Sequence, residues 1–131
     1  GKLAYMRAPS GIYDSKLGSI TFFGDVPKGT WVQVTETNRN DILAASKTSM
    51  EEALEHYPGH APSAALLFSC ASRRQILGSR TIEEYQLIQL NLRNDLPACG
   101  FYTNGEIAPL QQHGQTYFHN ETFVTVLIGE S

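Results

Sequence analysis

Residues 64–84 read AALLFSCASRRQILGSRTIEE, and this stretch decides how the chain folds. Its first part, residues 64–69, is a short and continuous apolar run, which is typical of a strand covered on both faces. The Ser-Arg-Arg-Gln that follows has the form of a capping box, and a glycine stands where a helix could end. The stretch therefore predicts a buried strand that leads into one helical turn over residues 72–77.

A second helix is predicted immediately downstream. TIEE at residues 81–84 is another capping box, and the residues after it favour a helix that ends near Arg93. Ile88, Leu90 and Leu92 also alternate like the residues of a strand. Because the cap and the good helix formers agree with each other, we expect a helix.

The earlier part of the chain predicts strands and one further helix. Residues 17–24 and 30–36 alternate and carry β-branched and aromatic side chains, so they predict two strands joined by a short loop. Residues 2–7 predict another short strand. The Asn-Asp pair at 40–41 offers an N-cap for a helix that ends before the Pro-Gly pair at 58–59.

The remaining segments complete a predicted α+β fold. Residues 8–16 are rich in turn formers, and residues 98–104 and 121–129 predict the last two strands, joined by a loop. The order is β-β-β-α-β-α-β-β, which lacks the regular alternation of a doubly wound parallel sheet. We therefore expect one mixed, largely antiparallel sheet with two main helices, in a single domain over residues 1–131.

Composition excludes several functional classes. The 131 residues, 41% hydrophobic and 18% charged, have an ordinary globular balance. The net charge of −3 and the lack of a basic stripe argue against nucleic-acid binding. No apolar run is long enough for membrane insertion. The two cysteines lack CxxC or zinc spacing, which favours free thiols in a reducing, cytoplasmic setting.

The junction of strand and helix near residue 70 could bind an anion. Backbone N–H groups at a helix start are unpaired, and the Arg73 guanidinium could fork onto a carboxylate or phosphate. The same position would favour the thiolate of Cys70. In the alternative, Cys70 is a small core residue and the arginines are solvated or pair with Glu83 or Glu84.

A second candidate lies in residues 99–109, CGFYTNGEIAP, where a carboxylate follows an Asn-Gly turn. Glu106 could accept an ammonium group, and Tyr102 could add a hydroxyl and an apolar wall. An amino acid carries both charges, so Arg73 and Glu106 together could hold one. A salt bridge between Arg73 and Glu106 is the alternative.

Metal binding and catalysis are not indicated. His56 and His60 have the spacing of helical metal ligands, but the Pro-Gly pair between them interrupts the helix. His113 and His119 precede the last strand and could be surface residues or haem ligands. Catalytic and nucleotide-binding motifs are missing, so the sequence predicts no enzyme and no metal site.

Three stretches resemble a known family. LLFSCASRRQILG (66–78), GFYTNGEIAP (100–109) and FHNETFVTVLIGE (118–130) resemble, in order, the C-terminal half of the FIST sensory domain. The resemblance implies a cytoplasmic input domain of signalling proteins that binds small ligands, amino acids among them. Some bacterial members are reported to bind haem and sense nitric oxide. Together with the residues weighed above, the expected ligand-binding set is Cys70, Arg73, Tyr102, Glu106, His119 and Asn120.

The resemblance also implies partners. Members of the family normally carry an N-terminal FIST half, so that half or a signalling output domain is the expected partner, and a homodimer remains open. We therefore expect a sensing domain for an amino acid or a similar small charged metabolite. The alternatives are an interaction or dimerisation domain without a ligand, using exposed apolar groups of the last strand, and a haem-linked nitric oxide sensor.

Overall fold

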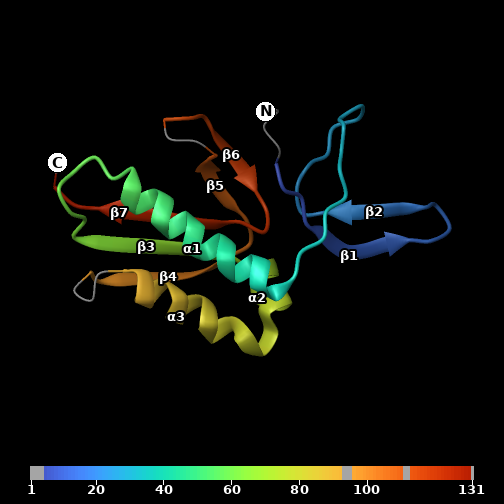
Figure 1. Cartoon of the computed structure of the whole chain (residues 1–131). Helices are drawn as coiled ribbons and strands as arrows, with labels where there is room; N and C mark the ends of the chain where they lie inside the picture. Colours follow the sequence, from blue (N-terminus) through green and yellow to red (C-terminus); the bar gives the residue numbers. More distant parts are fainter. Residues whose placement is uncertain (1–4, 93–95, 111–112, 131) are drawn as a thin grey trace.

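The computed structural model describes residues 5–92, 96–110 and 113–130. Its elements follow one another along the chain as shown in Figure 1. They are β1 (Pro9–Asp14), β2 (Ser19–Phe22), α1 (Arg39–Glu55), β3 (Ala64–Cys70), α2 (Ala71–Leu77), a 3-10 turn η1 (Gly78–Arg80), α3 (Thr81–Asn91), β4 (Ala98–Thr103), β5 (Glu106–Pro109), β6 (Thr116–His119) and β7 (Phe123–Ile128).

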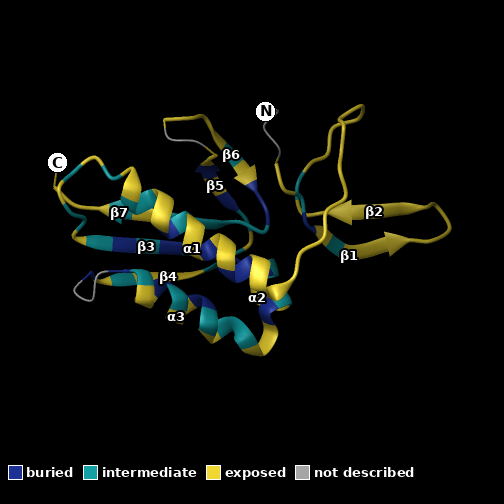
Figure 2. Cartoon of the chain, viewed as in Figure 1, coloured by how far each residue is buried: buried dark blue, intermediate teal, exposed yellow. Residues whose placement is uncertain are grey.

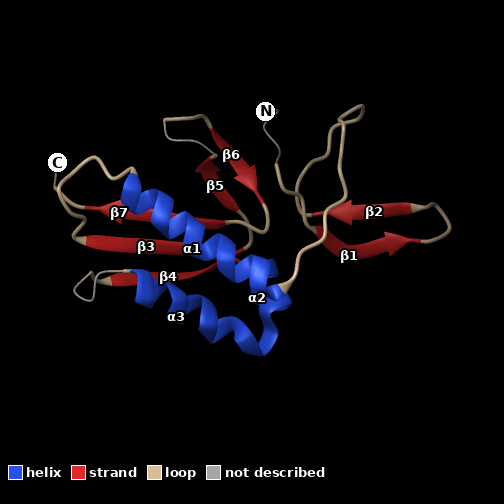
Figure 3. Ribbon diagram, viewed as in Figure 1, coloured by secondary structure: helices blue, strands red, loops and turns tan. Residues whose placement is uncertain are grey.

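The central sheet has three strands in the order β4-β3-β7. β3 pairs with β4 in parallel and with β7 antiparallel, so that Leu66 lies between Cys99 and Val126. The α2–η1–α3 segment connects the two parallel strands, which need a long crossover to run in the same direction (Figure 3). The predicted buried strand and the two helices after it are confirmed.

The core lies between this sheet and the two long helices. Every second residue of β3, including Ala65 and Leu67, points at α1 and α3, which together cover one face of the sheet (Figures 1 and 2). Burial of these apolar side chains provides most of the stabilisation that such a layer can gain. The buried members of this cluster are Met50, Ala65, Leu67, Ile88, Leu92 and Leu96.

Helix caps differ from those expected. The N-cap of α1 is Asn38, whose side chain accepts hydrogen bonds from two backbone N–H groups, and Asp41 completes a capping box. Neither α2 nor α3 has a side-chain cap. The Thr81 hydroxyl instead donates to the Gly78 carbonyl oxygen at 2.6 Å. The predicted helices form because packing against the sheet stabilises them without those caps.

The N-terminal hairpin was not predicted in this form. β1 forms within residues 8–16, where the sequence predicts a turn, and it pairs antiparallel with β2. Asp14 closes the hairpin because its side chain accepts hydrogen bonds from the backbone N–H groups of Lys16 and Leu17. The turn formers thus mark the end of the hairpin rather than the whole segment.

Two predicted N-terminal strands are wrong where they can be checked. Residues 30–36 form no strand, because their backbone pairs with no other strand among the described residues. Residues 5–7 of the predicted strand 2–7 also form none, and residues 2–4 lie outside the described residues. Alternation in sequence shows which residues suit a strand, but a strand also needs a neighbour.

β5 and β6 form a third, separate sheet that the sequence reasoning assigned to a loop. They pair antiparallel, with Glu106 opposite His119 and Ile107 opposite Phe118. The α+β class is confirmed, whereas the strands in the described residues form three small sheets instead of one. The extra pair matters for function because it carries two of the candidate ligand-binding residues.

Candidate functional site

Buried polar side chains gather where β3 and β4 end. Parallel strands place their carboxyl ends at the same edge of a sheet, so Cys70 and Thr103 lie side by side in register. The turn between β6 and β7 reaches the same edge, because the Cys70 N–H donates to the carbonyl oxygen of Thr122 at 3.1 Å. The ends of two strands and one turn therefore converge on one polar region, which we call the strand-end site.

Arg73 forms a buried ion pair in this site. Its Nη2 lies 2.8 Å from Oε1 of Glu84, and the two side chains are 2% and 4% exposed. The same nitrogen donates to the Ser46 hydroxyl and to the Ile42 carbonyl oxygen in α1. Arg73 therefore ties α1, α2 and α3 together, and it pairs with Glu84 rather than with Glu106.

The Glu84 carboxylate is saturated with donors. Besides Arg73, Oε1 accepts from the Ser46 hydroxyl at 2.7 Å. Oε2 accepts from the hydroxyls of Ser69 and Tyr102, both at 3.1 Å. Burial, and then the negative charge and hydrogen bond of Glu84, raise the pKa of Tyr102 to about 12. Glu84 thus anchors Tyr102, and sequence reasoning offered it only as an alternative partner of the arginines.

Glu106 is buried without a positive partner. It is 4% exposed, and its two carboxylate oxygens accept from the hydroxyls of Thr103 and Thr122, the latter at 2.7 Å. None of the ion pairs among the described residues includes Glu106. A buried carboxylate that has only neutral donors retains most of its desolvation cost. Glu106 therefore differs from Glu84, which has an arginine as its partner.

The turn at residues 121–122 links the Arg73–Glu84 ion pair to the Glu106 carboxylate. Arg73 Nη1 donates to the Glu121 carbonyl oxygen at 3.4 Å, and the next residue donates its hydroxyl to Glu106. Glu121 has a φ of 58°, in the left-handed region that a non-glycine residue seldom adopts. The turn therefore holds a strained backbone at the centre of the site.

His119 is also buried at this edge. It is 2% exposed, and its Nε2 lies 3.1 Å from the Ala108 carbonyl oxygen. Because a carbonyl oxygen only accepts, Nε2 carries the proton and donates. Among the described residues, the buried side-chain nitrogen and oxygen atoms without a partner are Nδ1 of His119 and Nε of Arg73.

Asn120 holds the N-terminal segment of the chain. Its Oδ1 accepts from the Ala8 N–H, and its own backbone N–H donates to the Met6 carbonyl oxygen, both at 3.3 Å. The ring of Tyr5 lies 5.9 Å from the ring of His119, measured between centroids. Residues 5–8 therefore cover this side of the strand-end site.

Cys70 is a small buried residue, which is the alternative to a reactive thiolate that the sequence leaves open. Its side chain is buried, and its sulfur accepts a hydrogen bond from the Ser72 hydroxyl at 3.1 Å. None of the described hydrogen bonds joins the thiol to a histidine, so no general base is positioned to activate it. In this arrangement Cys70 contributes its backbone N–H to the site rather than its thiol.

The family model described as the FIST C domain matches residues 1–109. The chain belongs to the FIST C domain family. FIST C domains are sensory-type domains of signalling proteins, which confirms the resemblance found in the sequence. The match takes in Cys70, Arg73, Tyr102 and Glu106, whereas His119 lies beyond it. No curated protein and no solved structure matches the chain.

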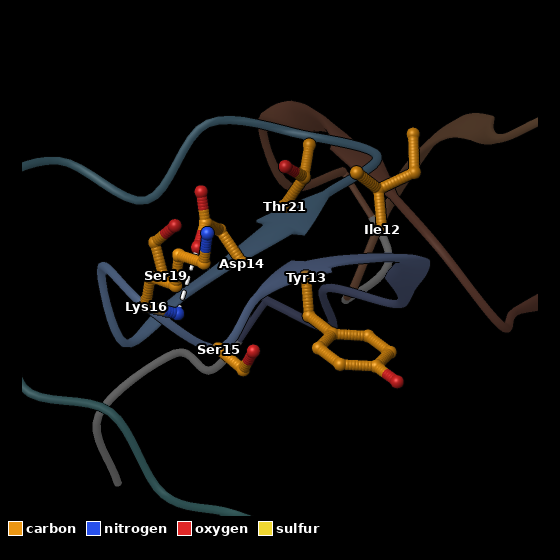
Figure 4. Close-up of a pocket in the computed structure, with 7 residues that line it drawn as sticks. All are labelled: Ile12, Tyr13, Asp14, Ser15, Lys16, Ser19 and Thr21. Carbon is orange, nitrogen blue, oxygen red and sulfur yellow. Dashed lines mark hydrogen bonds between the residues drawn. The ribbon is translucent and has the colours of Figure 1, made fainter.

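Two open hollows of this FIST C domain lie away from the strand-end site. One, of about 510 Å³, lies on the β1–β2 hairpin, where Asp14 accepts from the Lys16 N–H (Figure 4). The other lies beside the start of α1 and is lined by Asn38, Arg39, Asn40 and Arg80. Neither is lined by a predicted ligand-binding residue.

Candidate metal ligands do not gather among the described residues. Those residues contain no cluster of three or more His, Cys, Asp or Glu side chains placed to hold a metal ion. The two hollows described above offer no space for a haem beside a candidate ligand, because neither is lined by His113 or His119. Within the same described ranges, no helix has the length and apolar character to cross a membrane.

Proposed function

We propose that this FIST C domain is the small-ligand sensing input domain of a cytoplasmic signalling protein, and that it binds an amino acid or a similar small charged metabolite. The observation that carries the proposal is Glu106, a buried carboxylate whose described partners are two neutral hydroxyls. An ammonium group would supply the missing positive charge. A ligand bound there would recover the electrostatic cost that the protein alone bears.

The unused hydrogen-bonding groups of the site complement such a ligand. Nε of Arg73 is a free donor that suits a carboxylate oxygen, and Nδ1 of His119 is a free acceptor that suits an N–H group. Arg73 would therefore contribute one N–H to the ligand while Glu84 holds the rest of the guanidinium. The sequence instead predicts a bidentate contact between the Arg73 guanidinium and a ligand carboxylate. Because Glu84 holds that guanidinium, Arg73 chiefly positions the surrounding side chains.

Entry of the ligand requires movement of the cover. The Glu121–Thr122 turn and residues 5–8 both lie over the site, and both are held by hydrogen bonds to its edge. A ligand that displaces Thr122 from Glu106 would shift this turn, and through Asn120 it would shift the N-terminal segment. The proposed sensor thus transmits binding to the start of the chain, where an N-terminal FIST half or output domain would respond.

We propose binding rather than catalysis. The support is that the thiol of Cys70 lies against Ser72 with no described base, and that the buried carboxylates are held by hydroxyls and an arginine rather than placed as an acid–base pair. Neither nucleic acid nor a membrane is proposed as a partner, because the net charge is −3 and basic residues form no stripe.

A thermal-shift panel tests the ligand class. Free amino acids should raise the midpoint of unfolding, because a ligand that binds only the folded state stabilises it. N-acetyl derivatives lack the ammonium group and should not raise the midpoint at the same concentration. The corresponding amines, which lack the carboxylate but keep the ammonium group, should raise it by less than the free amino acids do. Stabilisation by N-acetyl derivatives that equals that of the free amino acids would overturn the assignment of Glu106.

A further inference from the structure

The chain exposes more surface than a self-contained domain of its mass. Its solvent-accessible area is 9512 Å². A compact monomer of 14.5 kDa exposes about 6,900 Å². The excess, about 2,600 Å², is larger than the roughly 800 Å² that each partner contributes to a standard protein interface. The chain therefore carries enough uncovered surface for a stable interface.

Much of this surface belongs to the N-terminal arm, which we define as residues 9–34. The β1–β2 hairpin and the segment after it lie beside the helix-and-sheet body rather than on it (Figure 1), and most of the arm is exposed (Figure 2). Trp31 is 93% exposed and Val34 is 95% exposed. Its exposed large apolar residues are Ile12, Tyr13, Leu17, Ile20, Phe22, Phe23, Val26, Trp31, Val32 and Val34.

The end of the arm, residues 30–34, begins an unpaired strand-like segment that continues to residue 36. Residues 30–36 alternate as a strand should, yet among the described residues the backbone of 31–37 has no hydrogen-bonding partner. Unpaired backbone groups and exposed β-branched side chains together form a ready template for association. The formal charges of the arm cancel, because Asp14 and Asp25 balance its two lysines.

The second uncovered surface is the open face of the central sheet. Helices α1 and α3 cover only the face that carries Ala65 and Leu67. All-parallel sheets are normally covered on both faces, and half of the pairing in this sheet, that of β3 with β4, is parallel. Here Phe101 is 65% exposed and stands edge-to-face against Phe68, with ring centroids 5.2 Å apart. The register places the following uncharged residues on this face: Leu66, Phe68, Cys99, Phe101, Val124, Val126 and Ile128.

We propose that two copies of this chain associate, with the N-terminal arm of each copy packed on the open sheet face of the other. The two surfaces are both apolar, and contact between them buries no charged residue of the sheet face and no net charge of the arm. A reciprocal exchange is self-complementary, as a two-fold dimer requires. The exchange covers both exposed surfaces of each chain. It therefore accounts for an excess of solvent-accessible area that is larger than one partner's share of a standard interface.

Sedimentation velocity of the full 131-residue chain over a concentration series tests the proposal. The unaltered protein should shift from monomer to dimer mass as concentration rises. Val34→Lys on the arm and Phe101→Lys on the face should each weaken the dimer by at least about tenfold, because each buries an unpaired charge. Leu90→Lys is the matched control, since Leu90 is 81% exposed on α3 and outside both surfaces.

Mixing the two weakened variants distinguishes arm exchange from other dimers. A pair of Val34→Lys and Phe101→Lys chains keeps one intact contact, between the arm of the second and the sheet face of the first. The mixture should therefore form dimers at concentrations where neither variant does alone. A face-to-face dimer would instead leave the Val34→Lys variant dimeric by itself, and an arm-to-arm dimer would leave the Phe101→Lys variant dimeric by itself. Either of these results, or an absence of mixed dimers, would overturn the exchange.

Alkylation of Cys99 gives a second readout. This thiol is exposed on the open face, whereas Cys70 is buried. Its reaction rate should fall as concentration drives association, and it should stay constant in the Val34→Lys variant, whose sheet face is unaltered. A protein that remains monomeric at every concentration, with constant Cys99 reactivity, contradicts the proposal. That result would leave the ligand proposal intact, because the thermal-shift panel does not depend on association.

Discussion

At the scale of single residues, the fold depends on one buried carboxylate. Replacing Glu84 by glutamine leaves the Arg73 charge buried without a partner, so the free energy of unfolding should fall by about 3–5 kcal/mol. Glu83→Gln is the matched control, because Glu83 pairs with Arg80 at the surface and its side chain is 39% exposed. Urea denaturation measures both variants, and equal losses of stability would contradict the role of Glu84.

Tyr102 provides a pH-dependent signal from the same cluster. Its phenol is neutral when protonated, and burial beside Glu84 raises its pKa from 10.0 to about 12. Its contribution to stability is therefore fully present below pH 10 and is lost as the pH rises through about 12. In a tyrosinate absorbance titration, Tyr102→Phe should remove a step near pH 12, with circular dichroism confirming that the fold persists. Removal of a step near pH 10 instead would show that Tyr102 is not held against Glu84.

Local sequence located some of these residues and missed others. An acid after an Asn-Gly turn and before apolar residues drew attention to Glu106, and the structure shows that it is buried, which the pattern alone did not predict. The choice of Glu84 over Glu83 as the partner of Arg73 depends on which side of α3 meets α1, and only tertiary packing decides that. Whether the expected residues contact a ligand remains a prediction.

At the scale of elements, a side chain caps the start of α1, whereas the cap that the sequence predicts for α2 is absent. Asn38→Ala removes the side chain that accepts from the N–H groups of Asn40 and Asp41, so it should cost about 1 kcal/mol. Ser72→Ala removes a residue that has capping-box spacing but makes no cap, and it should cost less. Thermal unfolding of both variants checks this order, and a larger loss for Ser72→Ala would refute it.

Helices and strands were predictable where the residues within the element itself determine its secondary structure. β3, α2 and α3 follow from a continuous apolar run, helix formers and a glycine, and they occur within a few residues of the expected bounds. The strand prediction failed where pairing decides it, because residues 30–36 alternate like a strand but pair with no strand among the described residues. β5 and β6, four residues each, are too short for periodicity to detect.

At the scale of the whole molecule, the strand-end site and the uncovered surfaces are physically connected. Asn120 bonds to the backbone of residues 6 and 8, which lead directly into the N-terminal arm. A ligand that moves the turn around Glu121 would therefore alter how the arm is held, and the arm is the surface proposed to reach another copy. Ligand binding and association would be coupled through the backbone of residues 6–8, which Asn120 holds.

The most direct test of this account is calorimetric titration of an amino acid that stabilises the domain. Glu106→Gln should weaken its binding by at least about thirtyfold, because the ammonium group loses its buried counter-charge. Glu83→Gln, a matched change of an exposed acid, should leave the affinity unchanged. Circular dichroism establishes that both variants are folded. Equal affinity of the unaltered protein and a folded Glu106→Gln variant would contradict the central claim that Glu106 receives the ligand.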